Sequence, residues 1–247
     1  MLASETDGVN IYEGCGSTHR DTRQKEGVGR GSDAGIAFDG DAARGLCVDE
    51  KGNVVDGDFI MAICALDMKQ RGKLRHNTVV GTIMTNIGFS KFCEANDIRF
   101  VATKVGDRYV LEEMEMEDYR FGGEQSGHVI FRDFATTGDG QLTAIQLLCH
   151  LRACGKKLSE LAGVMKRYPQ VMRNIQVSAE GKLAFYSNDA VKDAIHRHKE
   201  ALGDDGRVVV RVSGTEPLIR VMVEGKSEKV IKKAAADIAA VVEKELC

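Results

Sequence analysis

The chain has 247 residues, of which 43% are hydrophobic, 29% charged and 6% aromatic, a length that suits one large domain or two modest ones. Its 34 basic and 37 acidic side chains give a formal net charge of −3, which excludes a global positive field for nucleic acid or an anionic membrane. No stretch approaches the roughly 18 consecutive apolar residues of a membrane-spanning helix. The N-terminus lacks the basic and apolar regions of a signal peptide. We therefore expect neither nucleic acid nor membrane as a partner.

The seven cysteines are odd in number, and no two have Cys-x-x-Cys spacing. Several lie inside apolar runs, where a free thiol behaves as a small hydrophobe. This predicts a cytoplasmic protein without a disulfide framework or a zinc site. The chain also has 27 glycines against two prolines, which suggests loops whose backbone approaches a ligand.

Strand-like and helix-like segments alternate over the first two thirds of the chain. The charged run 20–26 predicts a solvated helix face, residues 34–38 predict a buried strand that ends in acids, and residues 46–55 predict a hairpin. There follow in order a helix over 56–72, a strand over 77–82, a helix over 86–96, a strand over 98–102, and helices over 109–118, 140–153 and 158–168. This alternation predicts a mainly parallel sheet covered by helices, with ligands at the carboxyl ends of its strands.

The pattern changes after Pro169. It predicts strands over 171–177, 207–212 and 218–223 and helices over 188–202 and 228–246. Long strands of antiparallel character with two helices indicate a separate α+β unit.

An acidic turn follows the first predicted strand. Asp39 and Asp41 lie two residues apart with Gly40 between them, so both carboxylates can point to one side. Hard oxygen ligands in this arrangement suit Mg²⁺, and Arg44 could bind a phosphate beside it. An acidic turn without a metal is the simpler alternative, and the spacing leaves both open.

Residues 122–128 form a glycine-rich segment. Glu124, Ser126 and His128 alternate in it, so on an extended segment they would share one face and offer donors and acceptors to a polyol. The alternative, which the local pattern favours, is a glycine-rich bend between two strands.

Residues 211–217 hold the most specific local pattern. Gly214 lies between the hydroxyl residues Ser213 and Thr215, and backbone N–H groups of such a loop can form a nest for an anion. Arg211 before the glycine and Arg220 after it supply two planar guanidinium groups for phosphate oxygens. This predicts a phosphate-binding loop, with a structural hairpin as the alternative.

Lys104 precedes Gly106 in a predicted strand-to-helix turn. This position suits a basic catalytic group and equally an ordinary helix cap. The nucleotide-binding patterns GxxxxGK[ST] and GxGxxG are both missing from the sequence.

The acidic turn, the glycine-rich segment and the loop at 211–217, taken in their order along the chain, resemble loops of the phosphohexomutase superfamily. Within this superfamily they resemble the bacterial branch that acts on glucosamine phosphates. The segments that carry the resemblance are a central segment at 7–19, a metal loop at 35–44, a sugar-recognition loop at 123–128, a phosphate loop at 211–217, and the matching runs 105–110 and 137–140. Together they cover essentially the whole chain.

The resemblance implies an α/β fold with three related three-layer α/β/α domains and a smaller C-terminal α+β domain. On this mapping, residues 1–53 are a remnant of α/β domain II with the metal loop, and residues 54–168 are α/β domain III with the sugar-recognition loop. Residues 169–247 are the C-terminal α+β domain with the phosphate-binding loop. The first domain and part of the second would be missing from this chain.

The resemblance also implies a reaction. Such enzymes are isomerases of carbohydrate metabolism, in amino sugar nucleotide biosynthesis, that interconvert glucosamine 6-phosphate and glucosamine 1-phosphate. A phosphoserine donates its phosphoryl group, glucosamine 1,6-bisphosphate forms as the intermediate, and Mg²⁺ offsets the charge of the transferred group. The implied roles are metal binding by Asp39 and Asp41, assistance to the transfer by Arg44 and Lys104, reading of sugar hydroxyls by Glu124, Ser126 and His128, and binding of the non-reacting phosphate by Arg211, Ser213, Gly214, Thr215 and Arg220.

The chain departs from the family in two ways. The phosphorylated serine belongs to the part that this chain lacks, and Ala43 stands where the metal loop has a third aspartate. Loss of a carboxylate removes a ligand and a negative charge, so Mg²⁺ binding should weaken. We therefore expect that the chain alone does not turn over.

Two alternatives to a mutase remain. One is a catalytically inactive fragment that still binds sugar phosphate. The other is a haloacid-dehalogenase-type phosphatase with Asp39 as nucleophile, which is disfavoured because Ala42 stands where that motif has Thr or Val. A partial second domain would also leave strand 34–38 short of sheet neighbours, which predicts a homodimer or docking with the missing N-terminal half.

Overall fold

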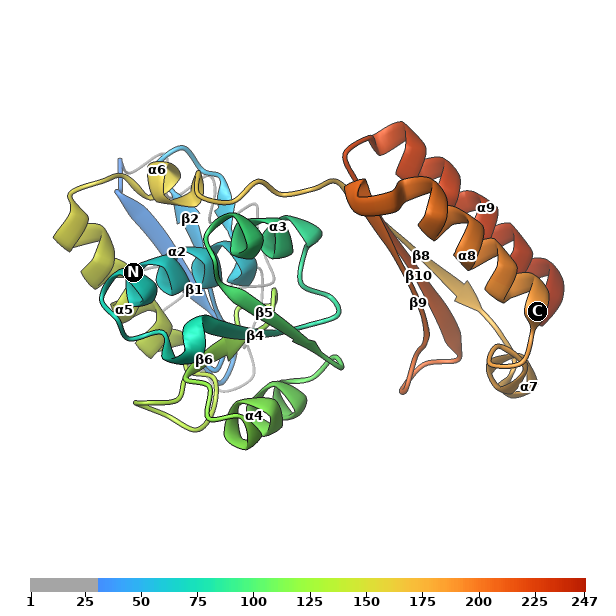
Figure 1. The fold of residues 1–247 in the computed structure, drawn as a ribbon, viewed down its shortest axis with the longest axis horizontal. Coiled ribbons are helices and arrows are strands. Elements are labelled where there is room, and N and C mark those ends of the chain that lie inside the picture. Colours follow the sequence, from blue (N-terminus) through green and yellow to red (C-terminus); the bar gives the residue numbers. More distant parts are fainter. Residues whose placement is uncertain (1–30) are drawn as a thin grey trace. The chain divides into compact units, whose positions relative to one another are not determined.

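The computed structural model describes residues 31–247 and divides the chain into two compact units, Met1–Lys166 (unit 1) and Arg167–Cys247 (unit 2). Helices and strands are mixed in both units, which confirms the α/β class (Figure 1). The central segment at 7–19 and the helix face expected at 20–26 lie outside the described residues. The three-part division at residues 53 and 168 stays a prediction.

The first sheet of unit 1 carries the acidic loop. Strands β1 (Ala34–Phe38), β2 (Gly45–Asp49) and β3 (Val54–Val55) pair antiparallel in the order β1-β2-β3, which confirms the predicted strand and hairpin. β2 is buried along its whole length, whereas β1 is half-buried, so the expectation that strand 34–38 is buried is wrong. Among the described strands β1 pairs with β2 alone. The expected lack of sheet neighbours therefore applies to one edge of β1.

The second sheet has the order β5-β4-β6-β7. Strand β4 (Thr78–Thr82) pairs in parallel with β5 (Arg99–Thr103) on one side and with β6 (Phe121–Gly123) on the other, as expected. Strand β7 (Val129–Phe131) pairs antiparallel with β6, so the glycine-rich segment connects two strands, as the favoured alternative predicts. The sequence does not give the bounds of β6, because this strand is three residues long and ends in two glycines.

Helices cover both faces of this sheet, as a three-layer α/β/α arrangement requires. Val79 in β4 packs in the core cluster that contains α2 (Gly57–Gln70) and α3 (Ile87–Ala95). The next residue, Val80, packs in a separate cluster with α4 (Asp107–Met116). Successive side chains of a strand point to opposite faces, so this split places helices on both sides of the sheet.

Polar side-chain caps start three helices of unit 1, each at the predicted place. The side chains of Asp56, Asn86 and Asp139 accept hydrogen bonds from backbone N–H groups at the starts of α2, α3 and α5 (Gly140–Cys154). A 3₁₀ turn spans Arg75–Asn77. Helix α6 (Leu158–Ala162) ends well before residue 168, because Gly163 follows it and glycine has low helix propensity.

Unit 2 is an antiparallel sheet with helices on one face. Strands β8 (Gln170–Gln176), β9 (Gly206–Val212) and β10 (Leu218–Gly225) pair in the order β8-β10-β9. Helices α8 (Asp189–Leu202) and α9 (Glu228–Leu246) pack on the apolar side chains of one sheet face. These elements confirm the α+β prediction, whereas the short helix α7 (Ala179–Ala184) and the 3₁₀ turn Gly203–Asp205 are additions.

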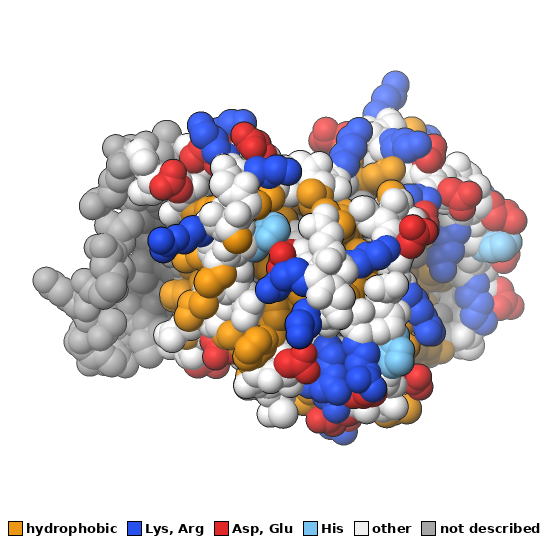
Figure 2. All heavy atoms as spheres, turned by 60° about the vertical axis from the view of Figure 1, so that its left-hand side comes forward, with side chains coloured by type: hydrophobic (Ala, Val, Ile, Leu, Met, Phe, Trp, Pro, Cys, Tyr) orange, Lys and Arg blue, Asp and Glu red, His pale blue; other side chains and the backbone are white. Residues whose placement is uncertain are grey.

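The surface carries charges of both signs, and the described cysteines are free thiols. On the face drawn in Figure 2, basic and acidic side chains are interspersed, with one group of Lys and Arg side chains low on the surface. None of the helices in the described part of the chain is both long and apolar enough to cross a membrane. The six cysteines within residues 31–247 are free thiols, and burial raises the pKa of Cys93 to about 12.

We expect Gly57→Ala to destabilise the protein by roughly 1–3 kcal/mol, the usual cost of overpacking. A Cβ at residue 57 would lie 2.0 Å from the carbonyl oxygen of Glu124 and 2.9 Å from that of Gln125, and neither backbone atom can rotate away. Thermal unfolding measures the effect. Gly214→Ala is the matched control, because no atom lies within 4 Å of a Cβ there. Equal melting temperatures for the two variants would contradict this close packing.

Candidate functional site

A cavity of about 560 Å³ opens in unit 1 at the carboxyl ends of β4, β5 and β6. This is where parallel sheets of α/β proteins bind ligands. The polar side chains in its wall include Asp41, Arg44, Asp107, Glu124, Ser126 and His128. The acidic loop and the glycine-rich segment, which are about 80 residues apart in sequence, therefore meet at one cavity.

Loop 39–44 is closed by contacts between its two ends. The N–H of Asp39 donates to the carbonyl of Arg44 at 3.2 Å, and the N–H of Arg44 donates to Asp39 Oδ1 at 2.9 Å. Arg44 Nε donates to Asp39 Oδ2 at 2.9 Å. The Asp39 side chain is 2% exposed and the Arg44 side chain 50%. Arg44 thus neutralises a buried carboxylate while its Nη groups, which have no partner within residues 31–247, stay available to an anion.

Asp41 is the other carboxylate of this loop. The N–H of Ala43 donates to Asp41 Oδ1 at 3.2 Å, and this bond holds the pKa of Asp41 below its ordinary value. Within residues 31–247 no three His, Cys, Asp or Glu side chains group closely enough to hold a metal ion. Because Arg44 engages both oxygens of Asp39 and Ala43 adds no carboxylate, these residues do not fit a Mg²⁺ site. Metal binding by Asp39 and Asp41 stays a prediction that this geometry disfavours.

Within the segment at 122–128, the first two residues end β6 and residues 124–128 form a tight turn to β7. Gly45 N–H donates to the Gly127 carbonyl, and Gly57 N–H donates to the Gln125 carbonyl, both at 3.1 Å. Gly127 has a φ of 92°, which strains any residue with a side chain. The bend between strands is therefore correct, and the extended segment is wrong. The turn itself, rather than strand alternation, brings its polar side chains to the cavity.

His128 and Glu124 each accept, at one polar side-chain atom, a hydrogen bond from the backbone N–H of a glycine. Gly138 N–H donates to His128 Nε2 at 3.0 Å, so the neutral ring carries its proton on Nδ1. Gly106 N–H donates to Glu124 Oε1 at 3.1 Å. Asp107 Oδ2 lies 3.7 Å from His128 Nε2, beyond hydrogen-bond reach. His128 Nδ1 and Glu124 Oε2, which have no partner in the described chain, can donate to and accept from a ligand hydroxyl.

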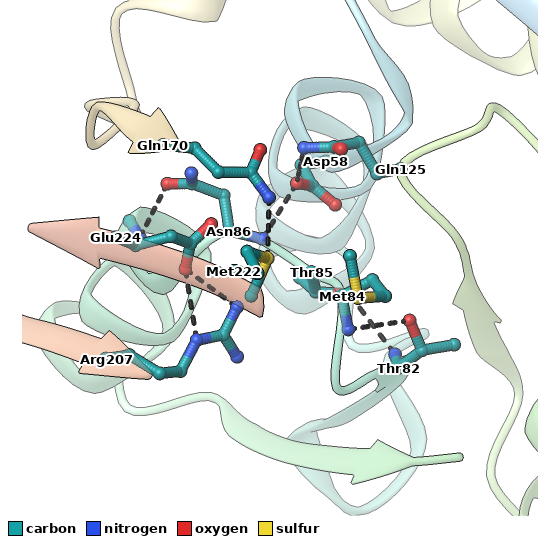
Figure 3. A network of polar contacts seen from close by, with 11 residues as sticks. Asp58, Thr82, Met84, Thr85, Asn86, Gln125, Gln170, Arg207, Met222 and Glu224 are labelled. Carbon is teal, nitrogen blue, oxygen red and sulfur yellow. Dashed lines mark hydrogen bonds and ion pairs between the residues drawn. The ribbon is translucent and has the colours of Figure 1, made fainter. Parts of the chain in front are cut away.

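Asp58 supports this cavity and was not apparent from the motifs. It is fully buried, and its Oδ2 accepts from Gln125 Nε2 and from the N–H of Asn86, each at 2.9 Å (Figure 3). Gln125 and Thr82 both line the cavity, and Thr82 Oγ1 accepts the N–H of Met84 at 3.1 Å. The one signal for Asp58 in the sequence is its position as an acid in the first turn of α2, and such an acid is equally typical of an ordinary helix start.

Lys104 follows β5 and is exposed. Its Nζ lies 5.7 Å from the centroid of the Tyr109 ring, which is a cation–π contact. As far as the described residues form it, the cavity wall does not include Lys104. Its catalytic role stays a prediction.

In unit 2, residues 213–217 connect β9 and β10. Ser213 N–H donates to the Leu218 carbonyl at 2.9 Å, and Glu216 N–H donates to Ser213 Oγ at 3.2 Å. Gly214 and Thr215 are exposed, and their N–H groups have no acceptor among the residues that the structure describes. Two adjacent free N–H groups at a turn can bind an anion.

Arg211 and Arg220 lie opposite each other on β9 and β10. Partial burial, together with the charge of Arg220, lowers the pKa of Arg211. Arg220 pairs with Glu216, while its buried Nε has no partner in the described part of the chain. Like charges opposite each other destabilise a strand pair, so an anion bound by both guanidinium groups would relieve their repulsion.

Residues 56–168 match the family described as phosphoglucomutase/phosphomannomutase, alpha/beta/alpha domain III, and residues 172–241 match the C-terminal domain of the same family. The chain belongs to this family. Membership in this phosphohexomutase family argues against the haloacid-dehalogenase-type alternative.

Curated relatives include phosphoglucosamine mutases. That of Caldanaerobacter subterraneus subsp. tengcongensis is 52% identical over 244 residues, which is 99% of this chain and 55% of that protein. That of Clostridium tetani is 50% identical over 245 residues, again 99% of this chain and 55% of that protein. This phosphohexomutase chain thus spans about 55% of the length of these relatives.

Solved structures of the superfamily share the fold. An N-acetylphosphoglucosamine mutase of Aspergillus fumigatus matches with a TM-score of 0.76 at 20% identity, over 93% of this chain and 52% of that one. The Aspergillus fumigatus enzyme in complex with GlcNAc-6P and magnesium matches with a TM-score of 0.72 at 19% identity, over 93% and 53%. At this identity the likeness shows the fold alone.

We expect calorimetric titration with Mg²⁺ to show little binding by the native chain and tighter binding by Ala43→Asp. The variant restores a third carboxylate beside Asp41, and Mg²⁺ prefers oxygen ligands of high charge. Ala43→Asn, which has the same shape without the charge, is the matched control and should bind no better than the native chain. If Ala43→Asp also fails to improve binding, the assignment of loop 39–44 as a metal loop is wrong.

Proposed function

We propose that this chain binds hexosamine phosphate and carries the sugar- and phosphate-binding parts of a phosphoglucosamine mutase. That enzyme interconverts glucosamine 6-phosphate and glucosamine 1-phosphate through a phosphoserine and a 1,6-bisphosphate. The observation that carries the proposal is the meeting of loop 39–44 and the β6–β7 turn at one cavity, where Arg44, Glu124 and His128 offer matched donors and acceptors.

The charge of the cavity supports an amino sugar as the ligand. Acids in its wall include Asp41, Asp107 and Glu124, while Arg44 is its one Lys or Arg residue within the described chain. A protonated amino group is attracted to such a wall, whereas a neutral hydroxyl gains less from it. Glu124 and His128 bind sugar hydroxyls or the amino group, and Ser126 adds an exposed hydroxyl.

The loop at 213–217 binds the phosphate group that does not react. Gly214 and Thr215 donate their N–H groups, Ser213 can donate its hydroxyl, and the guanidinium groups of Arg211 and Arg220 supply positive charge. Planar guanidinium forks match phosphate oxygens in geometry as well as in charge.

Binding without turnover is the second candidate function. It is favoured by loop 39–44, where Arg44 occupies both oxygens of Asp39 and Ala43 supplies no ligand. The free thiols suit the cytoplasm. The half-buried β1 supports pairing with a second copy or with a separate N-terminal half, and a clean monomer on size-exclusion chromatography would argue against both.

We expect Glu124→Gln to bind glucosamine 6-phosphate about tenfold more weakly, because it loses a charged hydrogen bond worth about 1.5–3 kcal/mol. Its affinity for inorganic phosphate should stay unchanged, whereas Arg211→Met should weaken both ligands. Isothermal calorimetry measures the dissociation constants of both ligands for the native chain and each variant. Glu112→Gln, an exposed acid paired with Arg108, is the matched control. An unchanged sugar phosphate affinity in Glu124→Gln would remove Glu124 from the site.

We expect the chain alone to bind glucosamine 6-phosphate without converting it. The experiment supplies glucosamine 1,6-bisphosphate and Mg²⁺ and follows both monophosphates by ³¹P NMR. Absence of turnover together with calorimetric binding supports the binding function. Robust interconversion would instead establish a complete mutase and overturn the second candidate.

A further inference from the structure

Lys182 lies against the phosphate-binding loop on a helix that the sequence pattern does not predict. Ser178 caps this helix, α7, with its Oγ accepting from the N–H of Gly181 at 3.0 Å. Gly181 packs against the end of α9, since a Cβ there would lie 2.2 Å from the carbonyl oxygen of Leu246. This packing anchors α7 and holds the half-buried Lys182 in place.

The ammonium group of Lys182 spans the loop. Its Nζ donates to the carbonyl of Ser213 at 2.7 Å and to the carbonyl of Glu216 at 3.1 Å. Hydrogen bonds from a charged donor are roughly twice as strong as neutral ones. Lys182 forms no ion pair with any carboxylate among residues 31–247, so its positive charge is not neutralised there.

The contact with Ser213 orients a peptide plane. In a trans peptide the carbonyl of one residue and the N–H of the next point in opposite directions, and the described chain has no cis peptide bond. Because Lys182 holds the Ser213 carbonyl, the N–H of Gly214 points away from Lys182. The Glu216 carbonyl precedes Pro217, which has no N–H, so the second contact steadies the loop without orienting a donor.

We propose that Lys182 is a positioning residue of the phosphate-binding loop. By holding the Ser213 carbonyl it aims the Gly214 N–H at the bound phosphate, and its charge adds to those of Arg211 and Arg220. This inference rests on the proposed function of the loop. A merely structural lysine would change stability and leave the Gly214 amide and the phosphate affinity as they are.

The test uses the whole ¹⁵N-labelled chain. Lys182→Met removes the donor and the charge at similar length, Lys182→Arg keeps both, and Lys192→Met removes an exposed charge of α8 that pairs with Asp189. The amide resonance of Gly214 is recorded without ligand, and calorimetry gives the dissociation constants of inorganic phosphate and glucosamine 6-phosphate. We expect Lys182→Met to shift the resonance and weaken both ligands about tenfold. Lys182→Arg and Lys192→Met should resemble the native chain.

An unchanged phosphate affinity in folded Lys182→Met would overturn the proposal. If Lys182→Met does not fold, Lys182→Gln serves as the second variant, and a resonance and affinity that both match the native chain would overturn the proposal equally. If the native chain binds no phosphate, the proposed function of the loop fails. The Gly214 resonance then still decides whether Lys182 orients the peptide plane, since it is recorded without ligand.

Discussion

Backbone hydrogen bonds to the β6–β7 turn hold the unit 1 site together. Gly57, the first residue of α2, donates to the Gln125 carbonyl, and Gly45, the first residue of β2, donates to the Gly127 carbonyl. A helix and an unrelated sheet thereby clamp one turn from two sides. Glu124 and His128 flank the clamped residues, so these contacts hold their backbone, while the N–H groups of Gly106 and Gly138 hold one polar atom of each side chain.

The glycines make this clamp possible by leaving space for other backbone atoms. A Cβ would lie 2.0 Å from the Glu124 carbonyl oxygen at Gly57, 2.4 Å from the Gly45 carbonyl oxygen at Gly127, and 2.3 Å from the His128 ring at Gly138. The glycine-rich composition suggested backbone that approaches a ligand. In unit 1 these glycines instead allow protein segments to approach one another, and the cavity results from that close packing.

Local sequence patterns predicted the elements whose signals are local. Branched residues marked β4 and β10, and the caps Asp56 and Asn86 marked α2 and α3, because strand alternation and capping involve residues a few positions apart. Contacts between distant residues carry no such signal. Asp58 meets Gln125 across 67 positions, and Lys182 meets Ser213 across 31, so both supporting residues emerged only from the fold. The loops could be recognised in the sequence, whereas the residues that hold these loops in place could not.

The charges of loop 39–44 bear on the alanine at residue 43, where the resemblance implies a third aspartate. Two carboxylates and Arg44 leave the loop with one negative charge, and the buried Asp39 is already neutralised by a guanidinium group in direct contact. A third carboxylate at residue 43 would add repulsion beside Asp41 that a cation would have to offset. The contacts between Asp39 and Arg44 that close the loop do not involve the side chain of residue 43. Arg44 and Glu124 both line the unit 1 cavity, and the groups that they offer to a ligand there do not depend on a third carboxylate.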